Sequence, residues 1–211
     1  MKIVFVCGSP KENSLSMKII DQMVTYVKGH QYGILHVDEN LNRSMALQIM
    51  DMADGIVFVS PVYMGSLPSA LLGFLSDLEL HMRERKARIT AIVHGDLFDT
   101  DDTMNALSII ERWSARMGLT FMSGLGIGGC DALNIRESAF SNKHLSNGLQ
   151  NCMLSIINNH VFQSCTVSIG NRMAYRRMME NYYHARMEEN GVEPDTLNAK
   201  IGRFFRGTQN K

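Results

Sequence analysis

The sequence lacks several features that would assign a function directly. Its four cysteines are scattered, at Cys7, Cys130, Cys152 and Cys165. No two of them form a C-x-x-C pair, so the sequence indicates neither a zinc site nor a redox dithiol. No apolar run approaches the ~18 residues of a membrane-spanning helix, and the apolar stretch at the N-terminus is too short for a signal peptide. We therefore expect a soluble, cytoplasmic protein.

The sequence also lacks net charge. Its 21 Lys and Arg residues balance its 21 Asp and Glu residues. Bulk electrostatics therefore point to neither nucleic acid nor a membrane surface as a partner. A P-loop nucleotide site is excluded as well, because no G-x-x-x-x-G-K-S/T sequence is present. With 211 residues, the chain is long enough for one α/β domain and an appendage.

The N-terminal segment is the part around which the chain is organised. Residues 1–6 form an apolar, β-branched run that is typical of a strand buried on both faces of a parallel sheet. A polar loop, residues 8–16, leads into a helical pattern. Such a loop suits an anion, because free backbone N–H groups meet the positive end of the helix dipole there, and Ser9, Ser14 and Ser16 add hydroxyl donors. A simple helix cap at Ser14 fits the same residues equally well.

The strand-loop-helix unit recurs along the chain. Further strands are predicted at residues 31–37, 56–59, 88–93 and 119–123. Helices are predicted between them and after them, at residues 44–53, 67–78, 102–117 and 142–159. Five strands alternating with helices predict an α/β fold, a doubly wound parallel sheet with helices on both faces. Ligands of such sheets bind at the carboxyl ends of the strands.

The C-terminal residues depart from this pattern. We expect one domain at residues 1–170 and a helical extension with a tail at residues 171–211. A Met-, Tyr- and Arg-rich helix is predicted at residues 171–190, with Tyr175 and Tyr182 on one side. Such a stripe more often packs on its own domain or on a partner subunit than on a substrate. A homodimer is therefore expected.

Two segments, each after an apolar strand, carry a resemblance to a known family. The first reads Gly8-Ser9-Pro10-Lys11-Glu12-Asn13-Ser14-Leu15-Ser16. The second runs from Ala53 to Pro68 and includes Ser60-Pro61-Val62-Tyr63-Met64-Gly65. Together, and in this order, they resemble the flavodoxin-like NAD(P)H-dependent FMN reductases, a family of cytoplasmic flavoproteins. The resemblance covers residues 1–130 and implies a flavodoxin-like fold.

The resemblance implies FMN as a non-covalently bound cofactor. In the family the first loop wraps the FMN phosphate, which here implies Ser9, Pro10, Lys11, Asn13, Ser14, Leu15 and Ser16. The second loop lies against the ribityl chain and the isoalloxazine ring, which implies Pro61, Val62, Tyr63, Met64 and Gly65. The third cofactor loop corresponds to His94, Gly95 and Asp96, and it is acidic here where the family is often rich in Gly and Ser.

The activity that the resemblance implies is electron transfer from NADH or NADPH to a small acceptor. The acceptor would be a quinone, a free flavin, or a nitro or azo compound, and it would use the face vacated by the nicotinamide in a ping-pong cycle. Because the flavin supplies the chemistry, no catalytic side chain is assigned. The alternative is a flavodoxin-like electron carrier or sensor that acts through a protein partner. A scaffold that has lost flavin through its altered third loop is a further alternative.

Two other interpretations of the loops are disfavoured. Gly124, Gly126 and Gly129 spell G-x-G-x-x-G after a strand, but neither a clear helix nor a suitable acidic residue follows. We expect a tight loop lining the flavin edge instead. The acidic run from Asp96 to Asp102 lacks the Gly and Glu positions of a calcium loop.

Three side chains near these loops have competing roles. His94 ends a predicted strand, where a hydrogen-bonded structural role is favoured over proton donation. Cys7 is expected to be a small buried residue. Tyr63 is the aromatic residue expected nearest the flavin, either stacking on it or turning its hydroxyl toward it.

Overall fold

The computed structural model describes the chain apart from residues 82–85, 132, 134–141, 171 and 190–211. It divides into two compact units, Met1–Ile169 and Gly170–Lys211.

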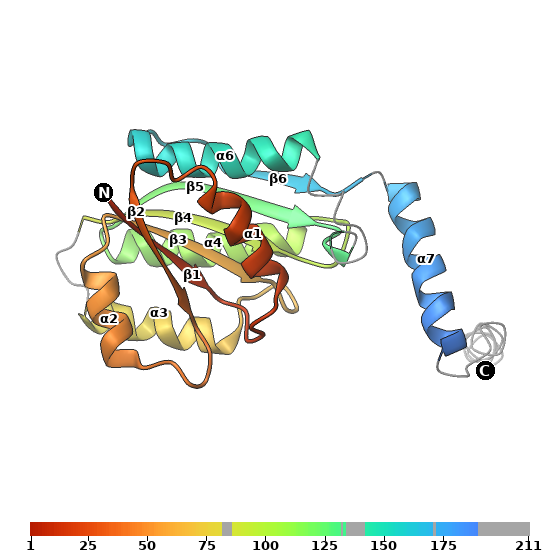
Figure 1. Ribbon diagram of the computed structural model, residues 1–211, viewed down its shortest axis with the longest axis horizontal. Coiled ribbons are helices and arrows are strands. Elements are labelled where there is room, and N and C mark those ends of the chain that lie inside the picture. Colours follow the sequence, from red (N-terminus) through yellow and green to blue (C-terminus); the bar gives the residue numbers. More distant parts are fainter. Residues whose placement is uncertain (82–85, 132, 134–141, 171, 190–211) are drawn as a thin grey trace, which may run out of the picture. The chain divides into compact units, whose positions relative to one another are not determined.

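The first unit is built on a six-stranded parallel sheet (Figure 1). Its strands are β1 (Lys2–Cys7), β2 (Gln31–His36), β3 (Gly55–Pro61), β4 (Arg88–His94), β5 (Thr120–Gly128) and β6 (Cys165–Ser168). They lie in the order β2-β1-β3-β4-β5-β6, and every neighbouring pair is parallel. The order 2-1-3-4-5 is that of flavodoxin-like sheets. The predicted fold is therefore confirmed.

The sheet has one strand more than the five expected. Strand β6 has four residues, reads Cys-Thr-Val-Ser and is largely exposed at the sheet edge. It therefore lacks the buried apolar run by which the other strands are recognised.

Helices cover both faces of the sheet (Figure 1). They are α1 (Leu15–Val24), α2 (Arg43–Asp51), α3 (Ser69–His81), α4 (Asp101–Arg116) and α6 (Lys143–Asn158). Helices α1 and α6 touch each other on one face. Helices α2, α3 and α4 pack on the other face, where their apolar side chains form one continuous cluster with the sheet. Within that cluster, Phe58 and Trp113 meet edge to face at 5.6 Å, and Trp113 Nε1 donates to Leu75 O.

Short polar side chains begin three of these helices. The Ser14 hydroxyl accepts from the N–H of Met17 at 3.3 Å, and Asn42 Oδ1 accepts from the N–H of Met45 at 3.1 Å. Asn142 caps α6 in the same way. Each cap satisfies an N–H group that the helix leaves free and contributes about 1 kcal/mol. Ser14 is therefore a helix cap, which leaves its part in anion binding open.

The glycine run at residues 124–128 lies within β5, so the expectation of a loop there was wrong. The glycines meet a packing requirement. A Cβ on Gly124 would lie 2.9 Å from Leu107 Cδ2 of α4, and one on Gly128 would lie 2.5 Å from the carbonyl oxygen of Phe98. The absence of side chains therefore allows α4 and the loop before it to approach the sheet closely.

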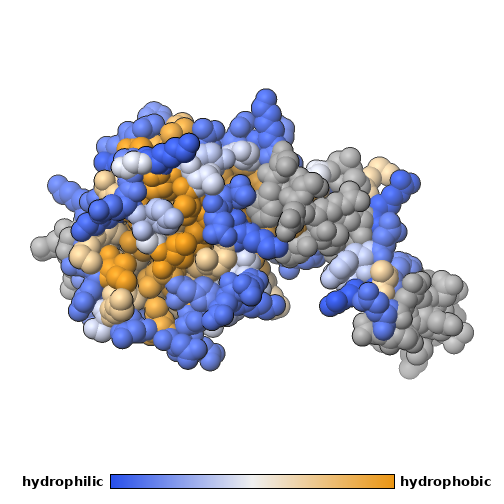
Figure 2. All heavy atoms as spheres, in the orientation of Figure 1, coloured by the Kyte–Doolittle hydropathy of each residue, from blue (hydrophilic) through white to orange (hydrophobic). Residues whose placement is uncertain are grey.

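Edge strand β2 leaves part of the sheet uncovered. Tyr32 and Ile34 are 52% and 43% exposed, and the Tyr32 ring meets Phe5 edge to face at 6.3 Å. Figure 2 shows the hydrophobic residues gathered over this part of the sheet. Gly33 lies between them, and a Cβ there would meet no atom within 4 Å.

The second unit contains helix α7 (Arg172–Glu189). Along this helix the rings of Tyr182 and Tyr183 lie 5.7 Å apart, and the Arg186 guanidinium lies 5.9 Å from the centre of the Tyr182 ring. Arg176 and Glu180 form an ion pair one turn apart at 2.9 Å. Within the parts of the chain that the structure describes, no helix combines the length and apolarity needed to cross a membrane.

Substitution of Gly126 by alanine is expected to destabilise the first unit. A Cβ there would collide with the Thr103 hydroxyl and lie 3.0 Å from Thr103 Cβ. The buried Thr103 hydroxyl already donates to Thr100 O at 2.6 Å, so it cannot rotate away without losing that bond. Urea unfolding should show a loss of about 1–3 kcal/mol. Gly33→Ala is the matched control and should cost nothing measurable; equal losses in the two variants would refute the packing argument.

Candidate functional site

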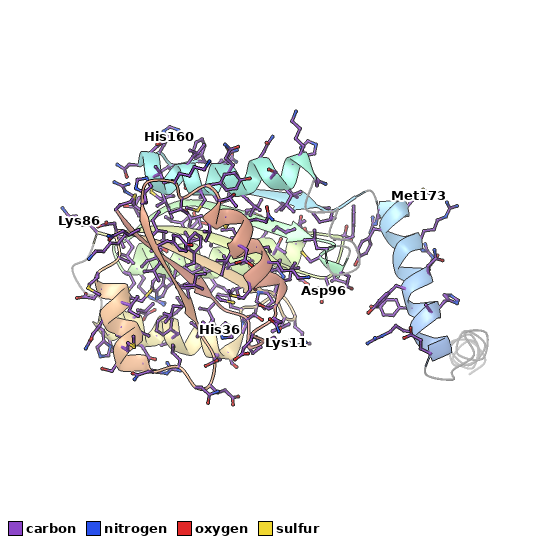
Figure 3. The ribbon with its side chains drawn as sticks, in the orientation of Figure 1. Lys11, His36, Lys86, Asp96, His160 and Met173 are labelled. Carbon is purple, nitrogen blue, oxygen red and sulfur yellow. The ribbon has the colours of Figure 1, made fainter. Side chains whose placement is uncertain are left out.

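The loops predicted to form the site meet at the carboxyl edge of the sheet. The N–H of Gly8 donates to Val59 O at 2.8 Å, which joins the first loop to β3. The N–H of Val62 donates to His94 O at 2.8 Å, which joins the second loop to β4. All fifteen predicted site residues lie on these loops or at the strand and helix ends that flank them. Figure 3 shows Lys11 and Asp96 at this end of the sheet and Lys86 at the opposite end.

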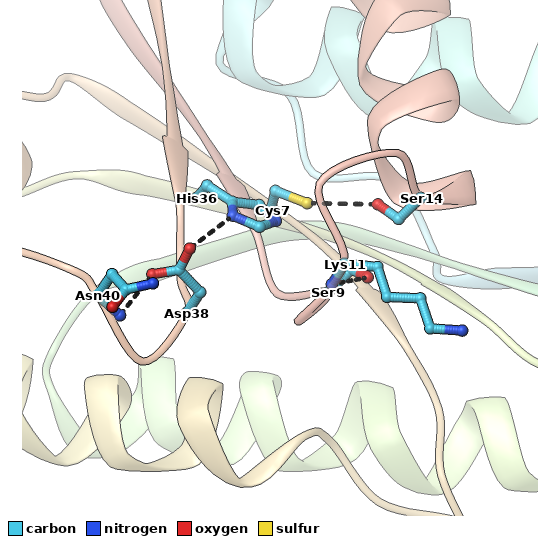
Figure 4. A network of polar contacts seen from close by, with 7 residues as sticks. All are labelled: Cys7, Ser9, Lys11, Ser14, His36, Asp38 and Asn40. Atoms are coloured by element: carbon cyan, nitrogen blue, oxygen red, sulfur yellow. Dashed lines mark hydrogen bonds and ion pairs between the residues drawn. The ribbon is translucent and has the colours of Figure 1, made fainter.

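The first loop is held close against β3. A Cβ on Gly8 would lie 2.7 Å from Leu71 Cδ2 and 2.8 Å from Ser60 Oγ, so any larger residue there would displace these side chains. Ser9 is buried, and its hydroxyl accepts from the N–H of Lys11 at 3.2 Å. Figure 4 shows this contact together with the approach of Ser14 to Cys7.

The two halves of the first loop differ in exposure. Pro10, Lys11 and Asn13 are exposed, whereas Ser14, Leu15 and Ser16 are buried. A ligand held by this loop would therefore meet backbone and hydroxyl groups on one side and the Lys11 ammonium on the other.

Cys7 lies beneath the first loop as a neutral thiol. Its Sγ is 3.9 Å from Ser14 Oγ. Burial raises the pKa of Cys7, and hydrogen bonds from the N–H of Ser9 and from Ser14 only partly oppose this effect. Because a thiol with a raised pKa is a poor nucleophile, Cys7 is suited to packing rather than to covalent chemistry.

The second loop presents Tyr63 on a tight turn. The N–H of Tyr63 donates to Ser66 O at 2.9 Å, and the N–H of Ser66 returns a bond to Tyr63 O at 3.0 Å. The two central residues, Met64 and Gly65, have φ values of 51° and 76°. A left-handed methionine costs of order 1 kcal/mol, and such residues occur where a loop must hold a ligand. The turn leaves Tyr63 48% exposed at the edge of the sheet.

The third loop brings negative charge to this edge. Gly95 O accepts from the N–H of Cys130 at 3.0 Å, which ties the loop to the segment after β5. Partial burial raises the pKa of Tyr63, and the charge of Asp96 raises it further. The pKa of Asp131 is also raised, first by burial and then by Asp96. The Asp96 carboxylate therefore acts on Tyr63 and Asp131 together.

His94 connects the third loop to the first. Its Nε2 lies 2.8 Å from Ser16 Oγ, although the two residues are 78 positions apart. His94 is 6% exposed and Ser16 is fully buried. Burial lowers the pKa of His94 to about 4, so its imidazole is neutral at pH 7.

The inference from sequence did not include His36, which also reaches this edge. His36 ends β2 opposite Cys7, and its Nδ1 lies 3.3 Å from Asp38 Oδ2. Its Nε2 is buried and has no hydrogen-bond partner among the described residues. Figure 4 shows this pair beside the first loop. The available signal was the predicted strand at residues 31–37, whose carboxyl end must lie next to that of β1.

The arrangement fits the phosphate and the ring system of FMN. The close approach at Gly8 and the hydroxyls of Ser9 and Ser14 surround the start of α1, where an anion is favoured. The turn at Tyr63 offers an exposed aromatic ring on which a ring system could lie.

Comparison with known proteins agrees with this fit. The fold and the site together define a flavodoxin-like protein. Residues 1–118, more than half of the chain, match the family model of the NADPH-dependent FMN reductases, and the chain belongs to that family. It is thus an oxidoreductase whose cofactor is FMN and whose electron donor is NAD(P)H. No curated protein matches the sequence.

Solved structures share the fold at low sequence identity. An azoreductase from Bacillus anthracis str. Sterne has a TM-score of 0.55 and 12% identity, covering 75% of this chain and 99% of that one. An NADH:FMN oxidoreductase in its apo form has a TM-score of 0.58 and 19% identity, covering 73% and 89%. A flavodoxin from Streptococcus pneumoniae TIGR4 has a TM-score of 0.55 and 16% identity, covering 75% and 97%.

Acid should destabilise the protein through His94. Free histidine has a pKa near 6.5, and burial lowers that of His94 to about 4. Between these values the unfolded chain binds a proton that the folded chain does not. The free energy of unfolding is therefore unaffected by His94 above pH 6.5, and it falls by about 3 kcal/mol in all as the pH falls to 4.

Urea unfolding of the wild type and of His94→Gln, at neutral pH and near pH 4.5, measures this effect. The variant lacks the titrating group, so its unfolding free energy should fall less over the same interval. An equal fall in both proteins would show that His94 does not titrate in this way.

Proposed function

We propose that this protein transfers electrons from NADH or NADPH to a small acceptor in two half-reactions that use one binding face in turn. Candidate acceptors are quinones, free flavins, and nitro or azo compounds. The observation that supports this proposal is the meeting of three loops at one edge of the sheet, bounded by an exposed Tyr63. FMN supplies the redox chemistry when bound, and the residues of this chain bind and orient it.

The first loop would hold the FMN phosphate. Ser9 and Ser14 offer hydroxyls, and the first turn of α1 offers N–H groups that lack partners within the helix. Lys11 is exposed beside them and would add a positive charge. Pro10, Asn13, Leu15 and Ser16 complete the proposed phosphate loop.

The second and third loops would hold the ribityl chain and the ring. Pro61 ends β3, and residues 62–65 form the turn that carries Tyr63. Gly95 and Asp96 follow β4 on the other side. A carboxylate at Asp96 would disfavour negative charge on the reduced ring and so lower its potential. A low potential favours the transfer of electrons to acceptors such as quinones and azo compounds.

We further propose a cytoplasmic homodimer. All four cysteines are free thiols, as a reducing compartment requires. Helix α7 carries the Tyr182, Tyr183 and Arg186 cluster, and aromatic and arginine side chains of this kind are enriched at interfaces. A second copy of the chain is the partner proposed for this helix. The small acceptor is the other partner, and neither nucleic acid nor a membrane is proposed.

The visible absorption spectrum should establish cofactor binding. Protein incubated with FMN and then dialysed should retain a flavin band, and NADH or NADPH should bleach it without air. Steady oxidation of NAD(P)H on adding menadione or an azo dye would support the reductase. Bleaching without steady turnover would favour the alternative, an electron carrier that needs a protein partner. Loss of the band on dialysis would contradict both.

Ser14→Ala is expected to weaken FMN binding about tenfold, because a hydrogen bond to a charged phosphate is lost. Riboflavin has no phosphate, so its affinity should not change. Asn42→Ala is the matched control. It removes an equivalent helix cap at α2, outside the three proposed cofactor loops, and should leave both flavin affinities unchanged. Fluorescence quenching of each flavin provides the dissociation constants. Equal FMN affinity in Ser14→Ala and the wild type would remove Ser14 from the phosphate site.

A further inference from the structure

His94 and Ser16 form a buried polar pair, in which the His94 ring is bonded to another side chain of the protein. The ring nitrogen Nε2 of His94 is directed at Ser16 Oγ, 2.8 Å away. Ser16 is the second residue of α1 and is fully buried. Ser16 therefore lies where the first loop enters the N-terminal turn of α1. In the proposed function the group bound there is the FMN phosphate.

The direction of the hydrogen bond decides what Ser16 can offer. A neutral imidazole carries its proton on one nitrogen only. With the proton on Nδ1, the Ser16 hydroxyl would donate to Nε2 and present only lone pairs to the loop, which repel an anion. With the proton on Nε2, His94 donates to Ser16 Oγ, and the hydroxyl hydrogen of Ser16 remains free to donate elsewhere.

Among the three serines of the first loop, Ser16 is the one whose hydroxyl is hydrogen-bonded to His94. The Ser14 hydroxyl accepts from the N–H of Met17, and the Ser9 hydroxyl accepts from the N–H of Lys11. Both bonds are made by backbone groups and exist whichever tautomer His94 adopts. Burial lowers the pKa of His94 to about 4, so at neutral pH it acts through hydrogen-bond direction and not through charge.

We propose that His94 is a positioning residue for the phosphate: its Nε2–H donates to Ser16 Oγ and thereby commits the Ser16 hydroxyl hydrogen to a phosphate oxygen. This inference rests on the proposed FMN site. Two residues from distant parts of the chain thus act as one donor. The backbone N–H groups at the start of α1 point to the same anion.

Substitutions at His94 separate this role from direct contact with the ring. A glutamine amide can place an N–H group near the position of Nε2, whereas the shorter asparagine cannot. His94→Asn and Ser16→Ala should each raise the FMN dissociation constant about tenfold and leave that of riboflavin unchanged. His94→Gln should restore FMN affinity to within about threefold of the wild type. The double variant His94→Asn/Ser16→Ala should bind FMN no more weakly than either single variant.

Several outcomes would overturn the inference. Equal weakening of FMN and riboflavin in His94→Asn would show that His94 contacts the ring or maintains the fold. Additive losses in the double variant would show that the two residues act separately. If the wild type binds riboflavin and FMN equally, the phosphate assignment fails while a flavin site remains. If it binds neither, the proposed function fails as well.

A measurement on the unsubstituted protein does not depend on whether the variants fold. Nitrogen-15 NMR of the histidine rings distinguishes the two neutral tautomers. In the FMN complex at pH 7, His94 should carry its proton on Nε2. A complex in which His94 carries the proton on Nδ1 would contradict the proposal directly, because Ser16 would then donate to the imidazole.

Discussion

The burial of the central strands on both faces is the constraint on which the rest of the structure depends. Every residue of β3 is buried, as are all but the first residues of β1 and β4. Mostly apolar side chains fill both faces of these strands, with Thr90 of β4 a buried polar exception, so the polar groups available to a ligand collect where the strands end. Ser9 and His94 do so, buried yet hydrogen-bonded. The site is a consequence of how the sheet is covered.

Sequence predicted the features that depend on neighbours along the chain. The strands at β1 and β4 are apolar and β-branched, and Ser14 precedes a clear helical stripe, so these local patterns were sufficient. The four residues of β6 have no such pattern, because an edge strand needs only backbone pairing to hold it. The glycines of β5 resemble a loop until α4 is placed against them.

In the candidate site too, sequence predicted the local features and missed the contacts between distant segments. Its loops were predictable from sequence because each directly follows a strand. The contact between Ser16 and His94 was not, because it joins α1 to β4 across the sheet and no pattern in either segment requires the other. The approach of the third loop to Cys130 likewise depends on the pairing of β4 with β5. What sequence could not supply is the set of bonds between loops, which determines where each hydroxyl and carboxylate points.

The uneven burial of the cysteines has a practical consequence. Cys7, Cys130 and Cys152 are buried, whereas Cys165 is exposed on β6. A thiol-reactive dye added to the folded protein would therefore attach at one place. That place is in register with Leu125 on β5, at the edge of the sheet. The native sequence thus provides a single attachment point for a fluorophore or spin label, and distances measured from it need no engineered cysteine.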